Sequence, residues 1–175
     1  MSLASGVGAI TDVHGGAGAK AAEFFKNCAA KAKDAGLDVS AATKAVIEEY
    51  MAGKKRIQGL GHRVHSQDPR RDVLWQLSKS SGLAGPCTEI SELVTDIFTE
   101  VKGKSLPINV DGVIGAIIAD MNLDIDLAKA LFVYGRVAGL SAHYFEEIST
   151  QKQMRRINFS NFVYEGKELR PFPKR

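Results

Sequence analysis

The sequence predicts an all-α protein. Apolar residues recur at three- and four-residue spacing in several segments, and glycines follow the ends of these segments, as is typical of helices. Only one short stretch, Asn158–Tyr164, suggests the period-two alternation of a strand. Because 45% of the 175 residues are hydrophobic, the chain can also form a substantial core.

Six helices can be placed along the chain, over residues 17–34, 41–52, 69–80, 90–101, 110–121 and 127–144. Gly36 and Gly53 follow the first two, and glycine commonly ends a helix because it adopts the left-handed conformation without strain. Ser40 is the expected N-cap of the second helix. Asp68 followed by Pro69 predicts the N-cap and the first residue of the third.

The patterns of the later segments predict how they are buried. In residues 90–101 the apolar side chains fall on one helical face, which we expect to meet the core. Residues 110–121 and 127–144 carry small and apolar side chains on nearly every side, so we expect both helices to be buried. The C-terminal residues 165–175, with two prolines and several charges, are expected to form a surface arm.

Composition restricts the partners and the compartment. Lysine and arginine outnumber aspartate and glutamate by only 23 to 20, too even a balance to indicate nucleic acid or an acidic membrane. Cys28 and Cys87 show no Cys-x-x-Cys spacing, and no apolar run approaches the roughly 20 residues of a membrane span. The first residues lack the features of a signal peptide. We therefore expect a reduced, cytoplasmic protein.

A glycine-bracketed loop is the first candidate site. Its sequence is Gly59-Leu60-Gly61-His62-Arg63-Val64, and it leads to the helix start at Asp68. Glycines let a backbone approach a ligand closely, and a helix N-terminus beside Arg70 attracts anions. A flexible connector followed by an ordinary N-cap would have the same local sequence, so the loop alone leaves both interpretations open.

Two charged residues lie among apolar neighbours. Burial of Asp111 would make it a better proton acceptor, although helix capping is the simpler explanation for this residue. Arg136 interrupts the apolar stretch Leu131–Leu140, where an unpaired guanidinium is costly. An anionic partner is therefore expected for Arg136, either an internal acid or a bound carboxylate.

The four histidines show no metal-ligand spacing. His14 lies just before the first expected helix, and its environment alone fits an ordinary loop residue as well as a functional one. We interpret His65 as a surface residue and His143 as a helix residue packed against a neighbour. The sequence also lacks a Gly-x-Ser-x-Gly motif and a phosphate-loop lysine, so we expect neither a metal site nor a serine-hydrolase mechanism.

Taken together, three segments in this order are similar to citrate synthase: His14-Gly15-Gly16-Ala17, Gly59–Val64 with Asp68-Pro69-Arg70, and Asn109-Val110-Asp111. The combination is far more specific than any single segment. Three further runs especially resemble citryl-CoA lyases and the citryl-CoA-cleaving module of ATP-citrate lyase: Asn109–Gly115, Tyr134–Gly139 and His143-Tyr144. The resemblance covers nearly the whole chain.

The resemblance implies a citrate synthase-like helical fold with two domains, and a homodimer as the minimal unit. Residues 1–14 would be a remnant of the large domain, residues 15–108 the small domain that covers CoA, and residues 109–175 the C-terminal part of the large domain. The family's N-terminal helices are not found upstream of His14. This difference leaves open a fragment or one part of a larger assembly.

The same resemblance implies a role for each candidate residue. His14 would hydrogen-bond the thioester carbonyl of acetyl-CoA, His62 would bind the carbonyl of oxaloacetate or the hydroxyl of citryl-CoA, and Asp111 would move the proton at the acetyl carbon. In the cleavage direction His62 would take the hydroxyl proton and Asp111 would protonate the enol. Arg70 and Arg136 match arginines that clamp the substrate carboxylates.

The implied CoA contacts are Gly59, Leu60, Gly61 and Arg63, with His65 at the edge. A third clamp arginine, which the partner subunit usually supplies, has only weak candidates in Arg155 and Arg156, and both fit solvent-facing charges equally well. The CoA thioester is the substrate, and no tightly bound cofactor is expected. If these roles are right, the catalytic residues and the two arginines should converge on one cleft.

Three functions remain open at this point. A citryl-CoA lyase is favoured by the resemblance around Asn109–His143. A citrate or methylcitrate synthase would use the same motifs but would also have to hydrolyse its citryl-CoA intermediate. A non-catalytic CoA-binding subunit would keep the motifs without the reaction. A purely structural helical protein would leave the joint occurrence of the motifs unexplained.

Overall fold

The computed structural model describes residues 2–12, 14–154, 156, 158–161, 163–168 and 170–171. Its regular elements in this part of the chain are α1 (Ser2–Gly8), α2 (Ala17–Ala35), α3 (Val39–Ala52), α4 (Pro69–Ser80), α5 (Pro86–Lys102), α6 (Val110–Asp120), α7 (Leu127–Thr150) and a 3₁₀ turn (Phe159–Asn161). The all-α expectation is therefore confirmed for the described residues. The strand suggested at Asn158–Tyr164 is wrong for the described residues, because Phe159–Asn161 form the 3₁₀ turn and residues 158, 163 and 164 belong to no strand.

Most helix ends lie where the sequence predicts them. α4 begins at Pro69, and the carboxylate of Asp68 accepts the backbone N–H of Arg70 at 3.1 Å. Gly36 ends α2 with a φ of 61° and donates its backbone N–H to the carbonyl of Ala32. These contacts satisfy backbone groups that have no partner inside the helix.

The expected cap of α3 at Ser40 is wrong by two residues. The helix begins at Val39, and the carboxylate of Asp38 accepts the backbone N–H groups of Ser40 at 2.9 Å and of Ala41 at 3.0 Å. Asp38 is the better cap because a charged acceptor makes stronger hydrogen bonds than a serine hydroxyl. Ser40 therefore lies inside the first turn.

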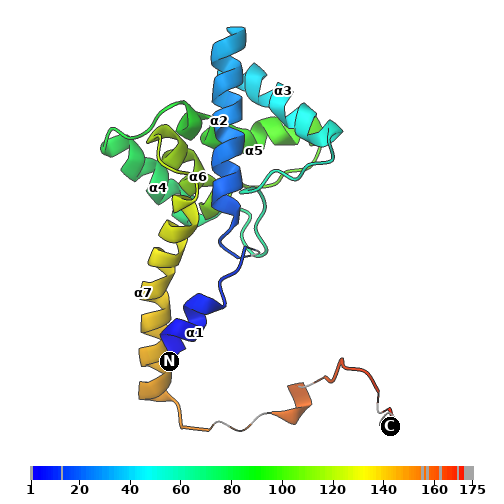
Figure 1. Ribbon diagram of the computed structural model, residues 1–175, viewed down its shortest axis with the longest axis vertical. Helices are drawn as coiled ribbons and strands as arrows, with labels where there is room; N and C mark the ends of the chain where they lie inside the picture. The colour runs from blue at the N-terminus through cyan, green and yellow to red at the C-terminus, as the bar shows by residue number, and fades with distance from the viewer. Residues whose placement is uncertain are drawn as a thin grey trace.

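α2 runs through the helical body, where it packs against α3, α5 and α6 (Figure 1). Phe24 and Phe25 of α2 are buried together with Ile47 of α3 and with Ile90 and Val94 of α5. The one-sided burial predicted for α5 is thus confirmed. Burial of this apolar surface is the main stabilising contribution to the body.

Two glycines let α2 and α6 approach each other closely. A side chain on Gly115 would place its Cβ 2.6 Å from the carbonyl oxygen of Gly18 and 2.7 Å from the backbone nitrogen of Ala22. α6 is buried along most of its length, as expected. Because His14 lies just before α2 and Asp111 lies in the first turn of α6, this close packing fixes the relative position of the two side chains.

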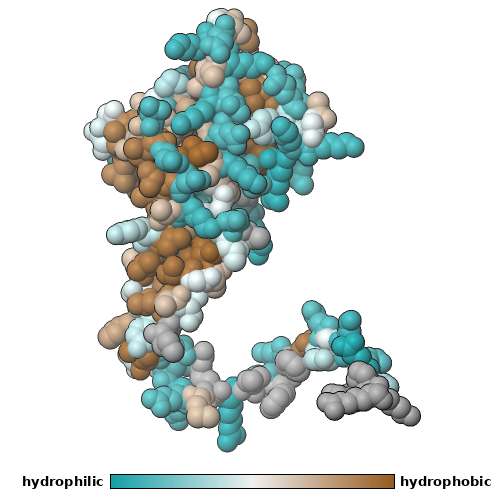
Figure 2. Space-filling view, viewed as in Figure 1, coloured by the Kyte–Doolittle hydropathy of each residue, from teal (hydrophilic) through white to brown (hydrophobic). Residues whose placement is uncertain are grey.

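The expectation that α7 is buried on nearly every side is wrong. Only Ala128 and Phe132 are buried, because the helix extends beyond the body and α1 lies along its far part (Figure 1). Tyr134 is 82% exposed and Phe145 is 68% exposed. Figure 2 shows hydrophobic side chains gathered over this helix. α7 therefore has an apolar surface that the rest of the described chain leaves uncovered.

The C-terminal residues 163–168 and 170–171 are exposed, in agreement with the expected surface arm. Among the helices of the described ranges, none combines the length and the apolar composition needed to cross a lipid bilayer.

Candidate functional site

One cavity of about 670 Å³ brings the candidate residues together. Five loops or helices contribute to its wall: the turn before α2, the loop between α3 and α4, the first turns of α4 and α6, and the second and third turns of α7. The charged and imidazole side chains on this wall are His14, His62, Arg63, His65, Arg70, Asp111 and Arg136. Residues far apart in the sequence thus line the same space.

Backbone hydrogen bonds hold the glycine-bracketed loop against the segment before α6. Gly61 donates its N–H to the carbonyl of Pro107 at 2.7 Å, and Asn109 donates its N–H to the carbonyl of Gly59 at 3.0 Å. The side-chain amide of Asn109 also donates to the carbonyl of Gly61 at 2.8 Å. Gly59 has a φ of 83°, and a Cβ there would lie 2.6 Å from the Cα of Gly112. Only glycine fits this crossing, which brings His62 opposite the start of α6.

The hydrogen bonds of His62 indicate which of its two ring nitrogens is a donor. Its Nδ1 accepts the backbone N–H groups of Val64 at 3.1 Å and of His65 at 2.9 Å. Since Nδ1 is an acceptor, the proton of the neutral ring is assigned to Nε2. The ring of His65 lies 4.6 Å from that of His62, centroid to centroid. His62 can therefore offer an N–H to an oxygen in the cavity.

Asp68 and Arg70 form a tight ion pair at the start of α4. The Nε and Nη2 atoms of Arg70 donate to the two carboxylate oxygens at 2.9 and 2.8 Å. Asp68 is fully buried and also accepts the backbone N–H of Val110 at 2.9 Å. Burial disfavours its charge, but these hydrogen bonds outweigh burial and lower the pKa of Asp68 to about 2. The carboxylate is therefore ionised at neutral pH and lies between α4 and α6.

Asp111 has the opposite electrostatic balance. Burial raises the pKa of its carboxyl group above the usual value, while the charges of Arg70 and His14 oppose the rise and the carboxylate of Asp68 adds to it. The side chain remains half-buried and lines the cavity. A carboxylate in this environment binds a proton more readily than one in water, which suits it to proton transfer.

The aromatic ring of Phe132 supports two other cavity residues. The His14 ring meets it edge-on, with centroids 5.4 Å apart, and the Cζ of Arg136 lies 5.5 Å from its centroid. No carboxylate in the described ranges forms an ion pair with Arg136. The anionic partner expected from the sequence is therefore not one of the described side chains, which leaves Arg136 available to a bound carboxylate.

A second, basic cavity of about 460 Å³ adjoins the glycine-bracketed loop. Gly61 lines both cavities, and Leu60 lines the second. The basic residues on its wall are Lys54, Lys55, Arg56 and Lys102. The motifs did not point to these residues, although the run of three cations just before the loop was a visible signal. A concave basic surface suits an anionic group such as a phosphate.

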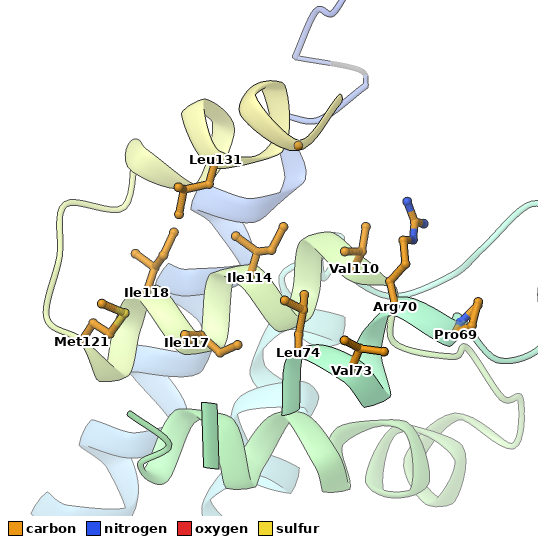
Figure 3. Close-up of a pocket in the computed structure, with 11 residues that line it drawn as sticks. Pro69, Arg70, Val73, Leu74, Val110, Ile114, Ile117, Ile118, Met121 and Leu131 are labelled. Atoms are coloured by element: carbon orange, nitrogen blue, oxygen red, sulfur yellow. The ribbon is translucent and has the colours of Figure 1, made fainter. Parts of the chain in front are cut away.

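An apolar groove of about 740 Å³ continues from the first cavity between α4, α6 and α7. Figure 3 shows Ile114 and Ile118 of α6 beside Leu131 of α7, with Arg70 beyond Val110 at one end. The polar end of this groove therefore belongs to the candidate site, and the remainder is hydrophobic surface.

Some predicted residues lie elsewhere. Arg155 is outside the described residues, and Arg156 is exposed and does not line the cavity. His143 pairs with Glu146 at 3.2 Å, but its side chain is 83% exposed, so the expected packing against a neighbour is wrong. The described ranges contain no group of three or more histidine, cysteine, aspartate or glutamate residues that could hold a metal.

Comparison with known proteins adds independent findings. The family model described as "Citrate synthase, C-terminal domain" matches residues 1–157. The solved citryl-CoA lyase from Hydrogenobacter thermophilus is 33% identical, with a TM-score of 0.75, and the match covers 98% of this chain and 65% of that chain. The ATP citrate lyase from Methanothrix soehngenii, solved in complex with citrate and coenzyme A, is 25% identical, with a TM-score of 0.65 and coverage of 94% and 28%.

A citrate synthase from Synechocystis sp. is 32% identical over 111 residues, which is 61% of this chain and 28% of the relative. This chain therefore spans little more than a quarter of the length of that curated relative.

Proposed function

Because this chain belongs to the citrate synthase family, we propose that it is an enzyme that cleaves citryl-CoA into acetyl-CoA and oxaloacetate. The observation that supports this most is the single cavity lined by His14, His62, Asp111, Arg70 and Arg136. The similarity to a citryl-CoA lyase over 98% of this chain supports cleavage as the reaction.

In this proposal Arg70 and Arg136 bind the carboxylates of the substrate. His14 donates a hydrogen bond to the thioester carbonyl, where negative charge develops as the carbon–carbon bond breaks. The two bonding electrons pass to the α-carbon of the thioester and form the enolate of acetyl-CoA, whose oxygen accepts the hydrogen bond from His14. Asp111 then delivers a proton to that carbon, and its raised pKa favours the protonated form that this step needs.

His62 is proposed to hydrogen-bond the oxygen that changes from hydroxyl to carbonyl. With Nδ1 accepting two backbone N–H groups, Nε2 is the donor toward this oxygen. Taking the hydroxyl proton, the role that the resemblance implied, would require an unprotonated Nε2 and a rearranged loop. We therefore propose Asp111 as the acceptor of the hydroxyl proton, which it then passes to the α-carbon, so that protons balance over the reaction.

The CoA portion is proposed to follow the loop from the first cavity into the second. The backbone of Gly59, Leu60 and Gly61 would meet the adenine, as the resemblance implies. The basic residues of the second cavity would pair with phosphates, because ammonium and guanidinium groups are the usual phosphate partners in proteins.

Citrate synthesis is the second candidate. The observation that favours it is 32% identity to a citrate synthase over 111 residues. This reaction runs through the same residues in reverse and then needs water to hydrolyse citryl-CoA.

The test is to incubate the purified chain with citryl-CoA and follow acetyl-CoA, oxaloacetate and citrate. Asp111→Asn and His62→Ala are expected to lower turnover by about 100-fold or more. Glu49→Ala, on the exposed surface of α3 and away from both cavities, serves as the control and should leave turnover unchanged. Citrate and free CoA as products would indicate a synthase. Absence of turnover would contradict catalysis by this chain alone and favour the non-catalytic CoA-binding subunit.

A further inference from the structure

We infer that Asp68 is a positioning residue that holds Arg70 and the first turn of α6 in the geometry that substrate binding requires. The inference rests on the proposed function, because it assigns Arg70 a substrate carboxylate as its second partner. Asp68 itself is fully buried and is not among the residues that line the cavity. It can therefore influence the substrate only through the groups that it holds.

The carboxylate of Asp68 accepts four hydrogen bonds. Oδ1 accepts the backbone N–H of Arg70 at 3.1 Å and its Nε at 2.9 Å. Oδ2 accepts the Nη2 of Arg70 at 2.8 Å and the backbone N–H of Val110 at 2.9 Å. Each oxygen thus binds two donors, so the carboxylate has little remaining capacity for any other group.

The arrangement leaves one side of the Arg70 guanidinium available. Arginine has five N–H donors, and Asp68 uses one on Nε and one on Nη2. Both donors on Nη1 and the second donor on Nη2 remain, and they form a fork that fits a carboxylate. The Arg70 side chain is 47% exposed and lines the cavity. Without Asp68, this long side chain would lose its fixed direction and would need to be ordered by the substrate.

The hydrogen bond from the Val110 N–H to Asp68 also helps to position Asp111, the proposed base. Val110 immediately precedes Asp111, and its N–H is one of those that a helix N-terminus cannot satisfy internally. A single carboxylate therefore fixes both the carboxylate-binding fork on α4 and the start of the helix that presents Asp111.

The experiment compares Asp68→Asn with Asp72→Asn, a matched control in which an exposed carboxylate on the same helix loses its charge. Dissociation constants for oxaloacetate and for CoA are measured separately by titration calorimetry. Asp68→Asn should weaken oxaloacetate binding by about tenfold or more, since it removes a charged hydrogen-bond partner, and should leave CoA binding unchanged. Asp72→Asn should change neither. A general structural defect would weaken both ligands.

A double-mutant cycle with Arg70→Lys tests whether Asp68 acts through Arg70. A lysine keeps the positive charge but cannot hold Asp68 with two bonds while it presents a fork, so this variant should also bind oxaloacetate about tenfold more weakly. Asp68→Asn should then add little in the Arg70→Lys background, whereas additive losses would overturn the inference.

Three results separate the two proposals. If Asp68→Asn bound oxaloacetate with the affinity of the wild type, the positioning role of Asp68 would be overturned and the proposed function would remain intact. If wild-type protein bound no oxaloacetate, both would fail. If Asp68→Asn did not fold, Arg70→Lys alone would decide, because undiminished oxaloacetate binding by that variant would overturn the need for a held fork.

Discussion

Asp68 and Asp111 both interact with Arg70, yet their pKa values move in opposite directions. Burial is the larger effect at Asp111 and raises its pKa, whereas hydrogen bonds outweigh burial at Asp68 and lower its pKa to about 2. An ionised Asp111 therefore opposes folding at neutral pH, while an ionised Asp68 favours it. One carboxylate suits proton transfer and the other suits structure.

The variant Asp111→Asn should lose activity without losing stability. The pKa of Asp111 is higher in the folded protein than in the unfolded chain. The favourable contribution of Asp111 to the free energy of unfolding is therefore fully present below the pKa of the unfolded state. It is lost as pH rises through the pKa of the folded state. At pH 7 the neutral amide avoids the cost of burying a charge, and the midpoint of thermal unfolding should stay equal or rise. The measurement is calorimetry of both proteins at pH 7 and near pH 3.

The advantage of Asp111→Asn over wild type should shrink at the lower pH, where the carboxyl group is protonated. A variant that is clearly less stable than wild type at pH 7 would show that Asp111 makes a net favourable structural interaction as an anion, contrary to the direction of its pKa shift.

The sequence could indicate the cavity residues because their motifs occur together in a specific order, whereas each motif alone left its role open. It indicated Asp68 only as an N-cap. The bond from Val110 to Asp68 joins residues that are 42 positions apart, and it depends on how α4 packs against α6. The donor nitrogen of His62 likewise depends on the fold of the loop, which sequence spacing does not report.

At the scale of helices, close packing of α2 against α6 is the feature most sensitive to mutation. We expect Gly115→Ala to destabilise the protein by about 1–3 kcal/mol, because the new Cβ would meet backbone atoms that cannot move aside. The nearest of these is the carbonyl oxygen of Gly18, 2.6 Å from the Cβ position. Chemical denaturation followed by circular dichroism measures the difference in free energy of unfolding.

Gly135→Ala is the matched control, since Gly135 lies inside α7 and a Cβ there would have no neighbour within 4 Å. This substitution should stabilise the helix by about 0.5–1 kcal/mol through reduced freedom of the unfolded chain. Equal effects of the two substitutions would contradict the proposed role of close packing. Because α2 and α6 also place His14 and Asp111, Gly115→Ala should reduce activity as well.

Helix positions were more predictable than helix environments. Capping by Asp68 and termination by Gly36 are local effects, so the ends of α4 and α2 were predicted correctly. The N-cap of α3 was misplaced because Asp38 and Ser40 are both residue types that suit an N-cap, and the local sequence does not show at which of them the helix begins. The prediction that α7 is buried was wrong. Its apolar composition indicates that the helix needs a partner surface, but it does not indicate that the described chain supplies that surface.

At the scale of the whole molecule, the resemblance to the citrate synthase family and the helical fold that it implied are both confirmed. The division into a large and a small domain stays a prediction, as does the homodimer. The uncovered apolar surface of α7 is relevant to the predicted homodimer. The apolar groove between α4, α6 and α7 meets the exposed face of α7, and together they form a hydrophobic surface of the kind that marks interaction sites.

We propose that a second copy of the chain covers this surface, and we predict that the purified protein sediments as a dimer that unfolds cooperatively. Phe145→Lys should shift the protein toward monomer, because Phe145 is 68% exposed on α7 and a buried lysine would lack a partner. Leu37→Lys, at an exposed apolar position between α2 and α3, should leave the dimer intact.

Sedimentation velocity over a range of concentrations distinguishes these outcomes. A wild-type chain that aggregates and recovers only with a different polypeptide would contradict the homodimer and favour a subunit of a larger assembly. A dimer unaffected by Phe145→Lys would place the contact on another surface.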